Sequence, residues 1–275
     1  MAPLGAEILE YVMRPTFEGP FYSRLSSLSA AMVRSWMRAL QGGAFYQVAG
    51  GMDAPWLRLA ERLTVRVGEQ VEAVHAAGGG VEVVTVGGMR RYDGAVLAVP
   101  APAARMVGDD MGDLPEWLGQ VRYAPEARVY AARRSAEDAQ FGVHVVPATT
   151  IGTVEFSSGR HGAWGACPPD WQWALVSVHG AASGALLDAP ADEVTRILWS
   201  AGREIAPAMF GLEDAEVVSL MRWRWAVPIM EPGHYTRLVS YRRMPPVVLA
   251  GDWTHQACIK GAVRSGEAAA AFGPA

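Results

Sequence analysis

The residues with the clearest chemical potential lie near the end of the sequence, in the range 246–270. A short apolar run, 247–250, is followed by Gly251 and Asp252, and Gly261 opens a stretch of small residues. We interpret this pattern as a buried strand, a tight acidic turn and a helix. The start of such a helix offers unpaired N–H groups and the positive end of its dipole to a polar or anionic ligand. Glycine lets a flat ring approach the backbone closely, and the Asp252 carboxylate accepts hydrogen bonds from sugar-type hydroxyls.

This run resembles the C-terminal flavin-binding motif of the superfamily of FAD-dependent amine oxidases, protoporphyrinogen oxidases and phytoene desaturases. The resemblance implies that Asp252 binds the ribityl chain of FAD, and that N–H groups around Ala262 and Val263 face the pyrimidine end of the isoalloxazine. The cofactor-binding residues implied by this motif are Gly251, Asp252, Trp253, Gly261, Ala262 and Val263. The local pattern alone is equally consistent with a strand–turn–helix that closes an α/β domain.

A second stretch, 221–234, carries a further resemblance. It holds a W-x-x-A-x-P run followed by P-G-H, formed by Trp223, Ala226, Pro228, Pro232, Gly233 and His234. In the superfamily the corresponding segment runs past the flavin, so the resemblance implies a ring contact from Trp223 or Trp225. The residues themselves also fit a buried strand with a proline-marked bend.

Two earlier segments fit the same superfamily. A GGM turn at 50–52 precedes a helix that we expect Asp53 to cap. The apolar residues of this helix that we expect to face inward are Trp56, Leu59, Ala60 and Leu63. Residues 64–99 read as a β-meander with glycine turns at 78–80 and 87–88. The resemblance places this meander in the FAD-binding domain and implies that Val71 contacts adenine through its backbone.

The dinucleotide-binding fingerprint of the superfamily is missing from these 275 residues, because no GxGxxG follows a strand. The resemblance therefore covers essentially the whole chain but only the later part of a family member. We expect a parallel sheet with an uncovered edge, completed by a second polypeptide that supplies the N-terminal dinucleotide-binding unit. A cofactor-free descendant that binds or transforms a substrate without flavin, and a non-catalytic stabilising subunit, are the alternatives.

The chemistry implied by the resemblance is oxidation or desaturation of a small, hydrophobic or aromatic substrate, with FAD accepting the hydride. His255 and Lys260 are the candidate catalytic residues, the first as a base and the second as a positive charge near the flavin N1–C2=O end. Monoamine oxidases carry a lysine in the strand that corresponds to 121–134. This chain has none there, and Arg128 is the nearest basic residue.

Charge, cysteine content and hydropathy exclude several classes of partner and site. The net charge of -4 argues against nucleic acid as the main partner. Cys167 and Cys258 lie far apart, with no metal-ligand spacing, which favours a reducing cytoplasm and no metal site. No signal peptide is visible at the start of the sequence, and no apolar run approaches the ~18 residues that span a bilayer.

We predict a mixed α/β fold in which a partial FAD-binding domain accompanies a substrate-binding domain. Residues 1–48 would form the helical part of the substrate domain and 49–100 the partial FAD-binding domain. Residues 101–243 would form the main substrate domain, and 244–275 the C-terminal FAD-binding segment. Helical spacing predicts an apolar helix broken at Pro15, a helix over 26–40 capped by Ser26 or Ser29, and an amphipathic helix over 190–206.

Overall fold

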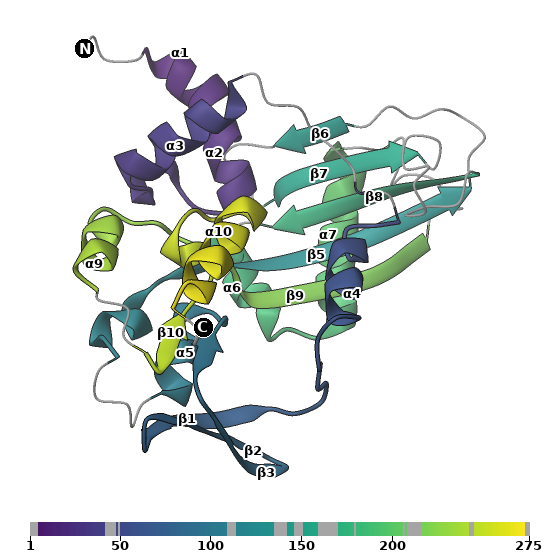
Figure 1. Ribbon diagram of the computed structural model, residues 1–275. Coiled ribbons are helices and arrows are strands. Elements are labelled where there is room, and N and C mark those ends of the chain that lie inside the picture. The colour runs from purple at the N-terminus through teal and green to yellow at the C-terminus, as the bar shows by residue number, and fades with distance from the viewer. Residues whose placement is uncertain are drawn as a thin grey trace. The chain divides into compact units, whose positions relative to one another are not determined.

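The computed structural model describes residues 5–41, 48, 50–108, 114–134, 142–145, 151–158, 170–178, 180–205, 207, 216–241 and 245–272. The chain divides into two compact units, and both mix helices with strands as predicted (Figure 1). The segments of unit 1 are Met1–Ser26, Trp36–Thr64 and Ala124–Val227. Those of unit 2 are Ser27–Ser35, Val65–Tyr123 and Pro228–Ala275. Each unit therefore brings together segments that are far apart in the sequence.

Unit 1 is built on a five-stranded sheet with the strand order β6-β7-β8-β5-β9. Its strands are β5 (Tyr123–Arg134), β6 (Gly142–Val145), β7 (Ile151–Ser158), β8 (Trp171–Val178) and β9 (Glu216–Pro228). The β5–β8 pair is antiparallel, with Arg128 opposite Ser177 and Val129 opposite Val176. Because side chains alternate across a strand, Arg128 and Ser177 share one face of this sheet and the two valines share the other.

Helix α7 (Ala191–Ile205) packs on the valine face of the sheet (Figure 1). The predicted amphipathic helix over 190–206 is thus confirmed, with acidic residues in its first turn and Arg203 in its last turn. The fully buried members of this core are Ala127, Val129, Ala131, Ala174, Val176, Val194 and Leu198. Truncating Leu198 to alanine in such a core costs about 2–5 kcal/mol of stability.

The N-terminal helices run as α1 (Ala6–Ile8), a π-helical turn η1 (Leu9–Met13) and α2 (Arg14–Phe21). The prediction that Pro15 breaks the helix is wrong. The backbone is helical without interruption from Ala6 to Phe21, and the π-helical turn η1, in which the Arg14 N–H donates to the Leu9 carbonyl, lies directly before Pro15. After the short η2 (Leu25–Ser27), α3 (Ala30–Leu40) begins with the predicted serine cap, because the Met32 N–H donates to Ser29 Oγ at 3.2 Å.

Helix α4 (Ala54–Ala60) follows the expected glycine turn, in which Gly50 and Gly51 have φ values of 85° and 99°. Two predictions about α4 are wrong. The Asp53 side chain makes no capping hydrogen bond. The apolar side chains expected to face inward are largely exposed, Trp56 by 48% and Leu63 by 66%, because no described segment packs over them.

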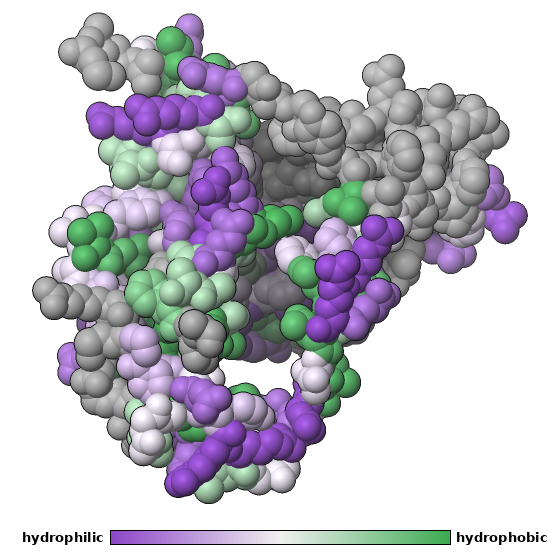
Figure 2. Space-filling model, in the orientation of Figure 1, coloured by the Kyte–Doolittle hydropathy of each residue, from purple (hydrophilic) through white to green (hydrophobic). Residues whose placement is uncertain are grey.

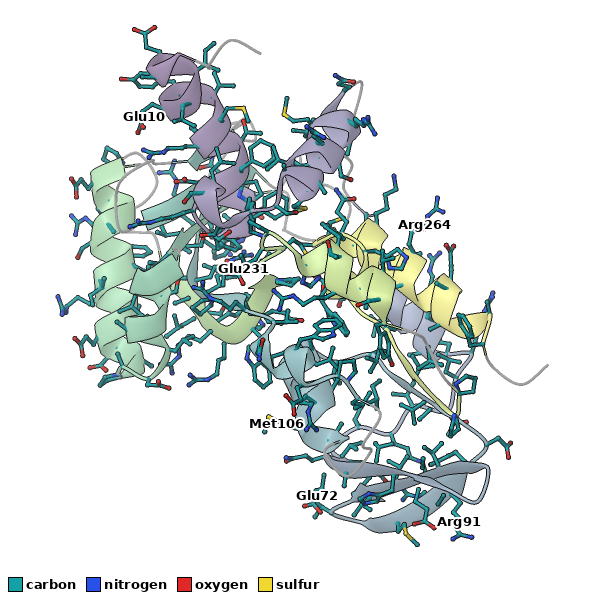
Figure 3. All side chains as sticks on the ribbon, turned by 90° about the vertical axis from the view of Figure 1, so that its left-hand side faces the viewer. Glu10, Glu72, Arg91, Met106, Glu231 and Arg264 are labelled. Carbon is teal, nitrogen blue, oxygen red and sulfur yellow. The ribbon has the colours of Figure 1, made fainter. Side chains whose placement is uncertain are left out.

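Unit 2 contains the predicted meander, formed by β1 (Val71–Ala77), β2 (Gly80–Thr85) and β3 (Gly88–Tyr92). The strands pair antiparallel in sequence order. The first turn is made by Gly78 and Gly79, whose φ values of 56° and 86° suit the twist of a tight hairpin. The ion pair between Arg91 and Glu82 ties β3 to β2, and Figure 3 shows Arg91 at this end of the unit.

A separate two-stranded parallel sheet pairs β4 (Ala95–Leu97) with β10 (Val247–Leu249). Among the described residues no further strand joins either edge of this sheet. Helix α10 (Ile259–Ala270) packs on it through Val248, Ala250 and Ala269. The other helices of the unit are α5 (Ala101–Val107), η3 (Glu116–Gln120), α9 (His234–Ser240) and η4 (Asp252–Thr254). Within the described ranges, no helix has the length and apolarity to cross a bilayer.

Candidate cofactor-binding site

The turn between β10 and α10 adopts a conformation that requires glycine at its first position. Gly251 has φ 148° and ψ 160°, and a Cβ atom there would lie 2.6 Å from Cδ1 of Trp253. The Gly251 N–H donates to Ser265 Oγ at 2.9 Å, and the Thr254 hydroxyl donates to the Gly251 carbonyl at 2.8 Å. Ser265 is fully buried in α10, so these bonds fix the turn to the helix behind it.

Asp252, the second residue of this turn, is a partly buried carboxyl group with few partners. Its Oδ1 accepts the Trp253 N–H at 2.9 Å, and it makes no ion pair with any described residue. Burial raises the pKa of Asp252 to about 6, because water no longer solvates the charged form fully. The nearby Tyr123 has a pKa raised by burial and by the charge of Asp252. A desolvated carboxyl in this state is stabilised by further hydrogen-bond donors.

The first turn of α10 leaves the N–H groups of Ile259, Lys260 and Gly261 without intrahelical partners. The Ala262 N–H instead donates to the Cys258 carbonyl at 3.0 Å. Within this helix start, the N–H groups without intrahelical partners are therefore those of Ile259, Lys260 and Gly261, directly before Ala262, and their contact with a ligand stays a prediction. Val263 carries the next N–H of the helix, and its side chain is exposed.

Gly261 is required by the local fold of the loop. A Cβ atom at this position would overlap the backbone carbonyl of Gln256, which the loop folds against the first turn of α10. This contact gives a reason for glycine at position 261 that does not depend on a ligand, and the close approach of a flat ring stays a prediction. The loop closes tightly enough that only glycine fits.

Trp253 does not present its side chain to a ligand, because the indole is 1% exposed. Its Nε1–H donates to the Val99 carbonyl at 3.3 Å, and Trp117 packs edge-on against the ring with centroids 6.3 Å apart. His234 binds the Trp253 carbonyl through Nε2 at 2.7 Å. Burial lowers the pKa of His234, so the ring is neutral and Nε2–H is the donor. Trp253 thus anchors the turn from the core side.

The two candidate catalytic residues lie in the same segment. His255 is half-buried, and its Nδ1 lies 2.9 Å from Thr254 Oγ1. Since the Thr254 hydroxyl donates to the Gly251 carbonyl, its oxygen accepts the hydrogen bond from Nδ1–H of His255. Lys260 is exposed at the second position of α10.

The remaining predicted contacts, Val71 and Trp223, come from other elements. Val71 begins β1 beside an irregularity in the register with β2, and its side chain is partly exposed. Trp223 lies on β9 in unit 1, where the Arg128 guanidinium sits 5.7 Å from its ring centroid. Within unit 2, the structure brings together the predicted residues of 251–263.

Sequence reasoning missed Ser265 and Tyr123. Ser265 is one of several small residues in α10, and nothing in its spacing distinguishes a residue that accepts the Gly251 N–H. Tyr123 accepts the Ala101 N–H at 3.1 Å and contributes to the surroundings of Asp252. Both roles depend on contacts between segments that the sequence does not place side by side.

Comparison with known proteins identifies the class. Residues 2–271 match the family model of flavin-containing amine oxidoreductases, and the chain belongs to this family. The family implies FAD as the cofactor. The β10–turn–α10 segment fits that group, because the partly buried Asp252 carboxyl makes no ion pair with a described residue and the first turn of α10 has N–H groups without intrahelical partners. A comparison with curated protein sequences gave no significant match.

Solved structures share the fold at low sequence identity. A protein assigned as a protoporphyrinogen oxidase from Exiguobacterium sp. 255-15 is 18% identical, with a TM-score of 0.75 over 96% of this chain. Cyclohexylamine oxidase from Brevibacterium oxydans IH-35A is 16% identical, with a TM-score of 0.66 over 98% of the chain. A fatty acid isomerase from P. acnes is 15% identical, with a TM-score of 0.68 over 94% of the chain. The chain spans 63%, 64% and 63% of these structures, respectively.

Proposed function

We propose that this chain holds the isoalloxazine half of an FAD site and the substrate-binding sheet of an oxidoreductase. The observation that carries the proposal is the Asp252 turn. It is a glycine-dependent turn, fixed to α10 by Ser265, that ends in a desolvated carboxyl with no cationic partner in the part of the chain that the structure describes. Such a carboxyl suits the ribityl hydroxyls of the flavin, which are neutral donors.

When bound, FAD supplies the hydride acceptor for oxidation or desaturation of the substrate. In this proposal, the residues of this chain bind the flavin and orient it relative to the substrate. Asp252 would accept a ribityl hydroxyl, and the N–H groups of Ile259 and Lys260 would face the electron-rich end of the ring. Lys260 would add a positive charge to that end, and His255, whose ring bonds to Thr254 through Nδ1, is the candidate base of this segment.

We propose that a second polypeptide supplies the N-terminal dinucleotide-binding unit. Three features support this arrangement. The sequence has no GxGxxG, the described part of the β4–β10 sheet has two unpaired edges, and α4 exposes an apolar surface. Leu57 of α4 is 60% exposed and Val96 of β4 is 51% exposed. Figure 2 shows apolar residues lying beside charged ones on α4. Exposed edges and apolar patches of this kind are normally covered.

The substrate that we propose is small and hydrophobic or aromatic. The support is the tryptophan-rich β9, on which Trp223 and Trp225 remain partly exposed. The names of the neighbouring structures include both an amine and a fatty acid as the molecule acted on, so they do not decide the substrate. Strand β5 carries Arg128 but no lysine. This difference argues against the reaction of monoamine oxidases, which carry a lysine in the corresponding strand.

The test is purification of the chain with any co-eluting polypeptide, followed by flavin quantification for wild type, Asp252→Ala and Glu267→Gln. Glu267 is an exposed acid of α10 and serves as the matched control. We expect a yellow complex whose flavin occupancy falls only in Asp252→Ala. A colourless, folded homo-oligomer would support the cofactor-free alternative. A yellow, active complex that is indifferent to Asp252→Ala would support the stabilising-subunit alternative.

A further inference from the structure

Unit 1 contains a charged cluster whose residues the flavin site does not use. The Arg128 Nε donates to Glu126 Oε1 at 2.7 Å, and its Nη2 donates to the Tyr22 hydroxyl at 2.9 Å and to the same Glu126 oxygen. Its Nη1 donates to the Tyr130 hydroxyl at 3.1 Å. Of the five N–H donors of a guanidinium, one on Nη1 is left without a partner among the described residues.

In the ion pair between Arg128 and Glu126, the arginine is the more accessible residue. The Arg128 side chain is 21% exposed and that of Glu126 is 6% exposed. Because the guanidinium covers one carboxylate oxygen with two of its own donors, an approaching molecule meets the cation first. Tyr22, which holds the cluster from α2, has a left-handed backbone with φ 48°. This conformation ends α2, as a left-handed residue commonly does at the C-terminus of a helix, and it places the Tyr22 hydroxyl within hydrogen-bond distance of Arg128.

An aromatic surface lies next to the cation. The Arg128 guanidinium stands 5.9 Å from the ring centroid of Tyr130 and 5.7 Å from that of Trp223. Alternation along β9 places Trp225 on the same face as Trp223, and the two side chains are 38% and 40% exposed, respectively. Flat indole surface beside a fixed cation favours a planar molecule that is neutral or negatively charged.

Ser177 adds an unsatisfied donor to this face. It lies opposite Arg128 in the β5–β8 register, its side chain is fully buried, and its Oγ has no hydrogen-bond partner in the described structure. A buried hydroxyl without a partner is unfavourable by about 1–3 kcal/mol. An oxygen acceptor, from a ligand or a bridging water, would remove this penalty.

We infer that the face of the sheet defined by Arg128, Ser177, Trp223 and Trp225, the Arg128 face, binds a flat organic carboxylate. The ring stacks on the tryptophans, and the carboxylate accepts the remaining Nη1–H of Arg128, directly or through a water that also satisfies Ser177. A protonated amine of the same shape is disfavoured, because its charge repels the guanidinium. The inference rests on the proposed function only in assigning the bound molecule as substrate.

The experiment is calorimetric titration of the purified protein, with any co-eluting chain, by indole-3-acetate, indole and tryptamine. These three probes share one ring system and differ in charge. We expect indole-3-acetate to bind at least about tenfold more tightly than tryptamine, with indole between them. Arg128→Lys keeps the positive charge but removes the planar set of N–H donors of the guanidinium, so it should reduce the preference for the carboxylate.

Trp225→Ala and Tyr92→Ala form a matched pair of exposed aromatic substitutions, because Tyr92 is 46% exposed on β3 of unit 2, and this pair decides the inference even if Arg128→Lys fails to fold. Trp225→Ala should weaken indole-3-acetate binding by about tenfold, and Tyr92→Ala should leave it unchanged. Tryptamine binding as tightly as indole-3-acetate, equal effects of the two aromatic substitutions, or no binding of any probe to folded protein would overturn the inference. Flavin absorbance, recorded separately, tests the proposed function. Carboxylate binding by flavin-free protein supports the inference while opposing that function.

Discussion

The N–H of Gly251 donates to the hydroxyl oxygen of Ser265 at 2.9 Å, so the acidic turn and the middle of α10 are held as one piece. The Ser265 hydroxyl in turn lies 2.6 Å from Thr254 Oγ1. Because the Thr254 hydroxyl donates to the Gly251 carbonyl, the Gly251 backbone and the hydroxyl groups of Ser265 and Thr254 form a closed ring of hydrogen bonds. This ring sets the position of Asp252 relative to the start of α10.

Ser265→Ala is therefore expected to destabilise unit 2 by about 1–3 kcal/mol, since it leaves the Gly251 N–H without its acceptor. Flavin occupancy should fall as well, because Asp252 loses its fixed position. Chemical unfolding and flavin absorbance measure the two effects. Ser240→Ala removes an exposed hydroxyl bound to the Arg237 carbonyl and should change neither. Equal stability of the two variants would show that the Ser265 bonds do not support the turn.

A pair of glycine substitutions tests the packing of the loop against α10. A Cβ at Gly261 overlaps the Gln256 backbone, whereas a Cβ at Gly266 would meet no atom within 4 Å. Gly261→Ala should destabilise the protein by about 1–3 kcal/mol, as overpacking does. Gly266→Ala should stabilise it by about 0.5–1 kcal/mol, because glycine is unfavourable inside a helix. Thermal unfolding checks both, and a stable Gly261→Ala would refute the tight loop.

The loop before α10 also shows which features could be predicted from the sequence and which could not. Local patterns predicted the meander, helix α7 and the Ser29 cap correctly, because each is decided by neighbouring residues. The sequence did not reveal the structural requirement for glycine at position 261. Its reason is a contact with Gln256 inside the loop, which depends on how the loop folds back rather than on any periodicity.

Contacts between distant segments account for the other failures. The apolar spacing of α4 correctly predicted a helix, but spacing alone does not say whether a partner surface covers Trp56 and Leu63. The Arg128 cluster joins residues from α2 and β5, with Tyr22 separated from Arg128 by 106 positions. The prediction at Pro15 failed for a different reason. A proline removes one N–H donor of a helix, but here the helix continues through it with a π-helical turn, Leu9–Met13, directly before it.

Asp252 should make stability depend on pH. Its pKa is raised from 3.8 to about 6, so the folded chain keeps this proton after the unfolded chain has lost it. The contribution of this group to stability is therefore fully present below its unfolded pKa and is lost as pH rises to about 6. We expect the free energy of unfolding of the wild type, compared with that of Asp252→Asn, to fall as the pH rises through this range. An identical pH dependence in both proteins would exclude a raised pKa at Asp252.

Binding of FAD should shift the same equilibrium. Ribityl hydroxyls that donate to Asp252 favour its charged form and lower its pKa, so flavin uptake near pH 5 to 6 should release a proton. Calorimetry in two buffers of different ionisation enthalpy measures that release. Asp252→Asn, which cannot titrate, should bind flavin without it. Uptake of a proton by the wild type would mean that the carboxyl stays protonated and donates to the cofactor.

The exposed apolar face of α4 provides the test of the two-chain arrangement. Leu57→Ser changes a side chain that is 60% exposed, so the free energy of unfolding of this chain should move by less than about 0.5 kcal/mol. Leu198→Ala, in the fully buried core under α7, should lower it by about 2–5 kcal/mol. If a partner covers α4, Leu57→Ser should nevertheless reduce the amount of the second chain recovered with this one, because apolar contact area is lost. Unchanged recovery in Leu57→Ser, together with unchanged recovery in Trp56→Ala and Leu63→Ser, would mean that the partner does not bind this helix.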